Sequence, residues 1–375
     1  MIYFDHAAAV PILPEVSRSY PILLERYSGN PESAHQLGHF LKQEREDLGD
    51  RLFDILLPQA RVEHKSCFFA GDTTELLNIL QYAYGDTAAT AWSSPLEHIS
   101  VNTMLQRSFG KVCNLPLNEF GKISDLPEDI ANAKFIVITH VQSEIGVMQD
   151  IPELMPKLRS AAPRAVILLD MVQSNMVYDF PATALLPDLL LVSGAKMGSN
   201  SGAALLAMGK AAGLLKDKLH TLRHKLYRIG RNNIAEAAAL VLAAQVNGVE
   251  RVERYLLICR INRFLREKLD GMILPNGKKC IMTVPASDSA ANILHIILPG
   301  YQAGVLVRMF SAEGIMLSSG SACQSESDEP SRVLQALNYS KSDSYSGLRI
   351  SIAGSNTMKE AETLLAKLEK ILKNY

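Results

Sequence analysis

The chain has 375 residues, of which 47% are hydrophobic and 21% are charged, and its net charge is −1. This composition is typical of a globular protein, and the length allows two domains. The near-neutral charge excludes the basic surface that nucleic acids and anionic membranes require. The start of the chain, MIYFDHAAAV, lacks the basic segment of a signal peptide, and the most apolar helical stretch, 234–249, is too short to span a bilayer. We therefore expect neither a nucleic-acid nor a membrane partner.

The five cysteines are odd in number and irregularly spaced, with no CxxC pair; they are Cys67, Cys113, Cys259, Cys280 and Cys323. This pattern favours a reducing cytoplasm and argues against a disulfide framework or a metal site. Cys67 and Cys259 lie in apolar runs, so we expect them to be inert core residues. Cys323 is different, because its surroundings, SSGSACQSESDEP (318–330), could not build a core. We therefore consider Cys323 a candidate for chemistry.

Helical and strand-like patterns alternate in the first two thirds of the chain. The expected helices are 36–56, 74–84, 97–107, 151–160 and 232–247. The expected strands are 135–141, 165–172, 188–195 and 203–208, which are continuous apolar runs of the kind found in parallel sheets covered on both faces. This alternation predicts a large α/β domain, with a doubly wound and mostly parallel sheet, over residues 15–252.

A smaller α+β domain is predicted from residues 1–14 and 253–375. Its expected elements are a helix at 251–270, a strand at 292–298, helices at 302–313 and 330–337, a strand at 347–352 and a helix at 357–373. The last helix opens with Thr357 and Glu360 in the spacing of a capping box. Leu364, Leu365, Leu368 and Leu372 then form its apolar stripe.

Two charged residues follow buried strands, where α/β folds place their ligands. Lys196 comes after LLLVSG, and Asp170 ends VILLD. A single loop lysine is usually a plain surface residue, but a desolvated carboxylate on another strand end requires a cationic partner. Together they indicate a pyridoxal phosphate site, in which the lysine forms the Schiff base and the aspartate pairs with the pyridine nitrogen.

A phosphate needs hydrogen-bond donors, and FFAGDTTELLN (68–78) offers a glycine turn at Gly71 and hydroxyls at Thr73 and Thr74 before a helix. This stretch by itself is also explained by an ordinary helix cap. Ser193 adds a hydroxyl near the lysine. His98, near the start of another helix, is either structural or a ring that stacks on the cofactor and moves protons.

The chain resembles the pyridoxal-phosphate-dependent cysteine desulfurases of the class V aminotransferase superfamily. The motifs that carry the resemblance run from one end of the chain to the other; they are YFDHAAAVP, GNPESAHQLG, LEHISV, HVQSEIGVMQD, LLDMVQSNM, SGAKMG, SSGSACQSESDEPSRVLQAL and LRISIAGSNT. The resemblance implies the pyridoxal-phosphate-dependent transferase fold, similar to that of aspartate aminotransferase. The length of the cysteine segment resembles the long-loop subgroup.

The resemblance also implies roles for individual residues. Lys196 would be the Schiff-base lysine, Asp170 the partner of the pyridinium, and His98 the stacking ring and proton carrier. Gln173 would bind the phenolic oxygen of the cofactor, Arg349 the substrate carboxylate, and Cys323 would be the nucleophile. Gln142 and Asn30 lie in two of the motifs and are assigned to the substrate, Gln142 also to the cofactor.

The reaction implied is removal of sulfur from L-cysteine, which gives L-alanine and a persulfide on Cys323. The persulfide would pass to an acceptor protein, a scaffold or a sulfur carrier, in iron–sulfur cluster assembly, tRNA thiolation or another sulfur pathway. Members of the family are homodimers with the cofactor near the subunit interface.

The sequence departs from the family at several positions. Ala195 replaces the histidine before the lysine, and Gln142 and Ser143 replace two asparagines. Arg228-Ile229-Gly230-Arg231 replaces Arg-Ser-Gly-Thr, whose threonine reaches the phosphate in the neighbouring subunit, and Arg231 is expected to take over that contact. The resemblance therefore implies a divergent member with an altered phosphate site.

Two alternatives to the desulfurase remain. The chain could bind pyridoxal phosphate for another reaction, such as selenocysteine lysis, cysteine-sulfinate cleavage or another class V lyase or aminotransferase step. It could also be a non-catalytic partner protein that uses the fold as an interaction surface.

Overall fold

The computed structural model describes residues 1–375 except 61, 63, 176, 182–183, 224–232 and 321–328. Up to residue 193 the elements are β1 (Ile2–Tyr3), α1 (Pro14–Arg26), α2 (Gln36–Leu56), β2 (Lys65–Ala70), α3 (Thr73–Tyr84), β3 (Asp86–Ser93), α4 (Ile99–Ser108), β4 (Phe109–Asn114), η1 (Glu128–Asn132), β5 (Ala133–Thr139), α5 (Ile151–Ala161), β6 (Val166–Asp170) and β7 (Leu189–Ser193). From residue 194 on they are η2 (Gly194–Lys196), β8 (Ala203–Met208), α6 (Lys210–Arg223), α7 (Ile234–Val249), α8 (Arg251–Leu269), β9 (Ile281–Met282), η3 (Ala286–Asp288), β10 (Ile293–Ile297), α9 (Ala303–Ala312), β11 (Ile315–Met316), α10 (Arg332–Ala336), α11 (Lys341–Ser344), β12 (Gly347–Ser351) and α12 (Met358–Lys373).

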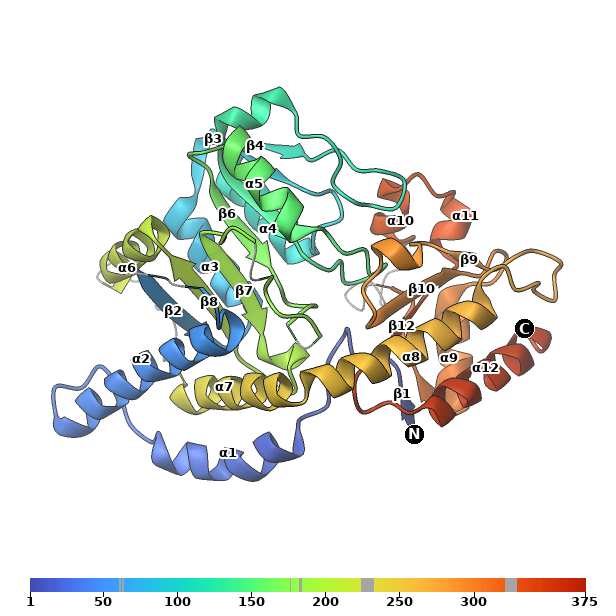
Figure 1. The fold of residues 1–375 in the computed structure, drawn as a ribbon, viewed down its shortest axis with the longest axis horizontal. Helices are drawn as coiled ribbons and strands as arrows, with labels where there is room; N and C mark the ends of the chain where they lie inside the picture. Colours follow the sequence, from blue (N-terminus) through green and yellow to red (C-terminus); the bar gives the residue numbers. More distant parts are fainter. Residues whose placement is uncertain (61, 63, 176, 182–183, 224–232, 321–328) are drawn as a thin grey trace.

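A seven-stranded sheet in the order β2-β8-β7-β6-β5-β3-β4 forms the centre of the large unit, which also contains α1–α7 (Figure 1). The strands from β7 to β4 are parallel, as the apolar runs predict, but β8 pairs antiparallel with both β7 and β2. The segment 194–202 between β7 and β8 explains the difference. It is too short for a crossover helix, so the chain must turn back.

Both faces of this sheet are buried, because successive side chains of a strand point to opposite faces. On β6, Ile167 and Leu169 pack in one apolar cluster with α2, α5 and α7, whereas Leu168 packs in another with α3, α4 and α6. This explains why the central strands are apolar throughout rather than alternating. The predicted doubly wound sheet is confirmed.

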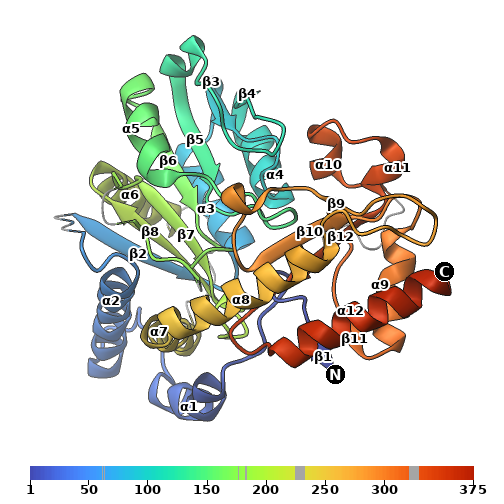
Figure 2. The same cartoon turned by 45° about the vertical axis from the view of Figure 1, so that its right-hand side comes forward.

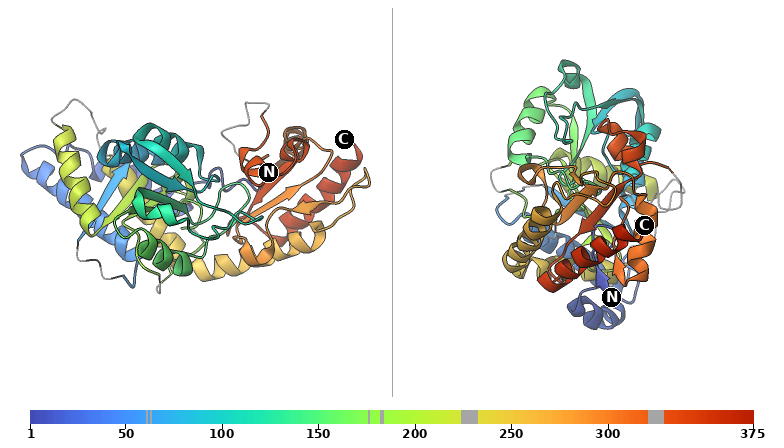
Figure 3. Two further views of the ribbon diagram at one scale, coloured as in Figure 1. Left: turned by 90° about the horizontal axis from the view of Figure 1, so that it is seen from above. Right: turned by 90° about the vertical axis from the view of Figure 1, so that its right-hand side faces the viewer.

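The small unit contains β1 and the elements from α8 to α12. Its three-stranded antiparallel sheet has the order β12-β10-β9, and the two-residue strand β1 pairs in parallel with β11. Helices α8, α9 and α12 pack on these strands, and α8 runs from the large unit to the small one (Figures 2 and 3). Thr357 and Glu360 form the predicted capping box of α12.

Separate core clusters accompany the two sheets. The clusters on the large sheet contain described residues from Val16 to Ala244, and the main cluster of the small unit contains Phe4, Val177 and residues from Ile258 to Leu372. The domain limits given above, 15–252 and 1–14 with 253–375, stay a prediction, which this distribution supports.

A tight turn at Gly146 joins the two units. Its carbonyl accepts a hydrogen bond of 2.8 Å from the N–H of Ala290, and its φ is +74°. A Cβ added to Gly146 would lie 2.8 Å from the carbonyl oxygen of Ile293. Only glycine therefore fits where the large unit meets β10.

Gly146→Ala is expected to lower the free energy of unfolding by about 3 kcal/mol or more, because left-handed strain and a backbone clash add together. Gly277→Ala is the matched control, since its φ is +79° and nothing lies within 4 Å of the added Cβ. The control should lose only about 1 kcal/mol. Chemical unfolding of both variants measures the difference, and equal losses would show that the contact with β10 is not tight.

Candidate active site

The carboxyl ends of β6 and β7 open into a cavity of about 420 Å³, which is large enough for a cofactor and a small substrate. Asp170 is the last residue of β6, Ser193 is the last of β7, and Lys196 ends the turn η2 that follows. Because β6 and β7 are parallel neighbours, these side chains meet at the same edge of the sheet.

The cavity brings together most of the residues that the sequence assigned to the site. Those that line it are Gly71, Thr73, His98, Gln142, Asp170, Gln173, Ser193, Lys196 and Arg349. Thr74 and Asn30 do not line it, and Arg231 and Cys323 lie outside the described residues. The wall also contains Ala195, at the position where the family has histidine.

Asp170 is a buried carboxylate with 7% of its surface exposed. Burial raises its pKa to about 6, although the N–H of Val172 donates a hydrogen bond of 2.8 Å to it. A carboxylate in this position is stabilised by a cation that enters the cavity. This favours a ligand with a protonated nitrogen directly at the end of β6.

Lys196 and His98 are two of the basic groups in the cavity wall. The Nζ of Lys196 donates a hydrogen bond to the carbonyl of Ala8, so the N-terminal segment reaches the lysine. His98 caps α4, and its Nδ1 lies 2.7 Å from the Oγ of Ser100. Burial first, and then the charges of Lys196 and Arg332, lower the pKa of His98. A lowered pKa favours the neutral ring, which can accept a proton.

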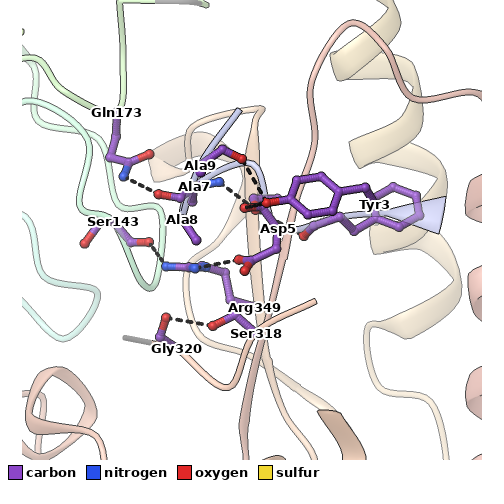
Figure 4. A network of polar contacts seen from close by, with 12 residues as sticks. Tyr3, Asp5, Ala7, Ala8, Ala9, Ser143, Gln173, Ser318, Gly320 and Arg349 are labelled. Atoms are coloured by element: carbon purple, nitrogen blue, oxygen red, sulfur yellow. Dashed lines mark hydrogen bonds and ion pairs between the residues drawn. The ribbon is translucent and has the colours of Figure 1, made fainter. Parts of the chain in front are cut away.

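Arg349, on β12, closes the cavity from the small unit and has only 3% of its surface exposed. Its Nη1 donates a hydrogen bond of 2.8 Å to the carbonyl of Ser143, and its Nη2 forms a 2.8 Å ion pair with Asp5 (Figure 4). Its buried Nε has no hydrogen-bond partner among the described residues. The guanidinium of Arg349 thus keeps N–H groups that can donate hydrogen bonds to a carboxylate.

Helix α3 begins at Thr73, one residue earlier than predicted, and Asp72 caps it by accepting a 2.8 Å hydrogen bond from the N–H of Glu75. Glu75 in turn accepts one of 2.9 Å from the N–H of Gly71. Sequence reasoning missed Asp72, although aspartate before a helix is a common cap. Because Thr73 lines the cavity and Thr74 does not, Thr73 is the threonine that can reach a ligand there, and Asp72 lies beside it in the cavity wall.

Three amide side chains assigned to ligands make hydrogen bonds within the protein. The Oε1 of Gln142 accepts hydrogen bonds of 2.7 Å from the N–H groups of Glu144 and Ile145. Gln173 donates one of 2.9 Å to the carbonyl of Ala7. Asn30 is exposed and accepts one of 3.0 Å from the N–H of Glu32. Their roles in binding stay predictions.

The similarity to known proteins extends over almost the whole chain. A profile of the family described as "Aminotransferase class-V" matches residues 2–364. The chain belongs to this family.

Two curated relatives and one solved structure illustrate how far the likeness extends. The "NifS/IcsS protein homolog" of Lactobacillus delbrueckii subsp. bulgaricus is 26% identical, over 100% of this chain and 98% of the relative. "Cysteine desulfurase IscS" of Methanosarcina thermophila is 25% identical, over 99% and 92%. A solved "NIFS-LIKE PROTEIN" superposes with a TM-score of 0.81 at 20% identity, covering 100% of both chains.

This class V membership confirms the superfamily and the transferase fold that the motifs predicted. It implies pyridoxal phosphate as the cofactor, and the site agrees with that chemistry. The described residues that line the cavity include a lysine, a buried acid at the adjacent strand end and the first turn of α3.

Three charged residues near the cavity, Glu97, Glu144 and Arg332, are not predicted from the sequence. Their effect on the site arises from their burial, which only the folded structure shows. Glu97 is 1% exposed and Glu144 is 2% exposed. Arg332 donates hydrogen bonds to the carbonyls of Pro95 and Glu97. Both acids lie inside motifs, LEHISV and HVQSEIGVMQD, which was the available signal.

Glu97 holds a proton near neutral pH. Burial is the main cause, and it raises the pKa to about 8, against 4.5 for an ordinary glutamate; hydrogen bonds from Thr139 oppose the shift. The unfolded chain therefore binds fewer protons than the folded chain between pH 4.5 and 8. The stability that Glu97 contributes is complete below this window and falls as the pH rises through it.

Glu97→Gln keeps the shape of the neutral acid and removes this pH dependence. We expect the free energy of unfolding of the variant, relative to the parent chain, to rise between pH 5 and 8 by at most about 1.4 kcal/mol per pH unit. Denaturant titrations at several pH values measure it. Glu153→Gln, at an exposed acid paired with Lys157, should show no such rise. A difference that is constant with pH would contradict the assignment.

Proposed function

We propose that the chain is a cysteine desulfurase, which removes sulfur from L-cysteine with the help of pyridoxal phosphate. The single observation that carries the proposal is the cavity at the ends of β6 and β7, since Lys196, Asp170, His98 and Arg349 all line it. The relatives named cysteine desulfurase support the same reaction.

The cofactor would be held at both of its ends. Asp170 would face the pyridine nitrogen, and the first turn of α3 with Thr73 would take the phosphate, helped by Ser193. Gln173 would reach the phenolic oxygen, and Lys196 would bind the aldehyde carbon. When bound, the cofactor supplies an electron sink for the carbon next to the substrate carboxylate.

The remaining groups would act on the substrate. Arg349 would bind the carboxylate, Lys196 would remove the proton from the α carbon, and neutral His98 would take the thiol proton. The Cys323 thiolate would form a bond to the substrate sulfur while the carbon–sulfur bond of the substrate breaks. The electron pair of the broken bond would go to the carbon that becomes the methyl group of alanine. The products would be L-alanine and a persulfide on Cys323.

The phosphate end differs from the family in charge. Asp72 and Glu75 place two carboxylates at the N-terminal turn of α3, next to the cavity wall. Arg231, in the place of the family's threonine, would add a positive charge from the neighbouring subunit of a homodimer. We propose that this added cation offsets the acids of α3.

The wider setting is also a proposal. The persulfide would pass to an acceptor protein, a scaffold or a sulfur carrier, in the cytoplasm. None of the helices in the described part of the chain is both long and apolar enough to cross a bilayer.

Replacement of the nucleophile tests the reaction. Cys323→Ala should lower sulfide release from L-cysteine more than about a hundredfold and keep the absorbance of the bound cofactor, whereas Lys196→Ala should lose turnover and change the absorbance. Alanine and sulfide are quantified in parallel. Undiminished desulfuration by Cys323→Ala would contradict the persulfide step. Cleavage of selenocysteine or cysteine sulfinate, but not of L-cysteine, would favour the alternative lyases. A chain without cofactor absorbance would favour the non-catalytic partner.

A matched pair of threonines tests the phosphate end. Thr73→Ala should weaken binding of pyridoxal phosphate about tenfold, because a hydroxyl hydrogen bond to a dianion is lost. Thr74→Ala should bind within about twofold of the parent, since Thr74 does not line the cavity. Titration of cofactor-free protein followed by absorbance gives both dissociation constants. Weaker binding by Thr74→Ala than by Thr73→Ala would show that Thr74, and not Thr73, binds the phosphate.

A further inference from the structure

Arg349 is buried with a single ion-pair partner among the described residues, and that partner comes from the other end of the chain. Its Nη2 lies 2.8 Å from an oxygen of Asp5, which is 344 positions away in sequence. An arginine stays charged at all relevant pH values, so burying it without a counter-charge would be costly. Asp5 supplies that charge.

The other titratable groups near Arg349 cannot replace Asp5. Burial raises the pKa of Glu144, and this acid accepts a hydrogen bond from the hydroxyl of Ser331. His295 pairs with Arg349 across the β10–β12 ladder, and burial lowers its pKa to about 3, so it is neutral. Of these groups, Asp5 alone contacts the guanidinium directly.

The backbone holds Asp5 in place before any ligand binds. β1 pairs with β11 immediately before it, Asp5 itself bridges to Ser351 of β12, and its carbonyl accepts hydrogen bonds of 3.0 Å from Ala8 and 3.2 Å from the hydroxyl of Tyr3. Figure 4 shows Asp5 on one side of the guanidinium and the Ser143 carbonyl on the other. The fork of Arg349 is therefore fixed from two sides.

Asp5 does not line the cavity, whereas Arg349 does. We propose that Asp5 is a positioning residue for the substrate carboxylate: it holds the guanidinium of Arg349 so that the remaining N–H groups meet the carboxylate in a preset orientation. The inference rests on the proposed function only in that the ligand is an α-amino acid. The negative charge of Asp5 compensates the buried guanidinium, and the hydrogen bond that Asp5 accepts sets the orientation of the guanidinium.

The test uses the holoenzyme and compares two ligands by the change in cofactor absorbance. L-alanine carries a carboxylate but no sulfur, and cysteamine carries an amine and a thiol but no carboxylate. Asp5→Ala should raise the dissociation constant of L-alanine about tenfold and change that of cysteamine less than about twofold, because one hydrogen bond to a charged group is lost. Asp5→Asn, whose amide oxygen accepts the same hydrogen bond, should restore L-alanine binding to within about threefold of the parent.

Asp188→Ala is the matched control. Asp188 forms an ion pair of 2.9 Å with Arg159. It directly precedes β7 and therefore lies at the opposite end of the strand from the cavity. The control should leave the ratio of the two dissociation constants unchanged even if the protein is less stable. Asp5→Ser is measured beside Asp5→Ala, so that poor folding of one variant does not decide the result.

Three outcomes would overturn the inference. Equal weakening of both ligands would show a structural role only. Tighter binding of L-alanine by Asp5→Ala would show that Asp5 competes for the fork, and an Asp5→Asn protein as weak as Asp5→Ala would exclude positioning by the accepted hydrogen bond. Because neither ligand undergoes sulfur transfer, the result is independent of whether the parent chain releases sulfide from L-cysteine.

Discussion

Burial of charged groups at the carboxyl edge of the sheet is the constraint on which the site depends. Asp170, Glu97, Glu144 and Arg349 all lie where the ends of the large sheet meet the small unit, and each is less than a tenth exposed. In such surroundings a charge persists only with a partner, and a carboxyl without one keeps its proton. The charge complementarity with the proposed cationic ring and amino-acid carboxylate rests on that single condition.

The N-terminal segment shows how this condition shapes the fold. Residues 2–9 leave the small unit at β1 and pass beside the cavity (Figure 4). Along the way Asp5 contacts Arg349, and the carbonyls of Ala7 and Ala8 accept hydrogen bonds from Gln173 and Lys196. One short segment thus contacts the group proposed for the substrate and two groups proposed for the cofactor, which couples the positions of the two units.

One of the departures that the motifs indicate, Ala195, lies in the wall of the cavity. Asp72 also lines the cavity and places a carboxylate at the N-cap of α3. Asp170, His98 and Arg349, which are proposed to bind the cofactor or to act on the substrate, line the same cavity. Under the proposed roles, the substitution at position 195 changes a contact to the cofactor, and the groups proposed for the chemistry are present.

The sequence by itself determined the elements whose signals are local. The apolar runs placed β5, β6 and β7, Thr357 and Glu360 placed the start of α12, and strand ends marked Asp170 and Lys196, because periodicity, capping and strand polarity are read within a few residues. Only the tertiary structure decided the direction of β8, the protonation of Glu97 and the partner of Arg349. Hairpin closure, desolvation and an ion pair across 344 positions arise from how distant segments pack, and no short window of sequence contains them.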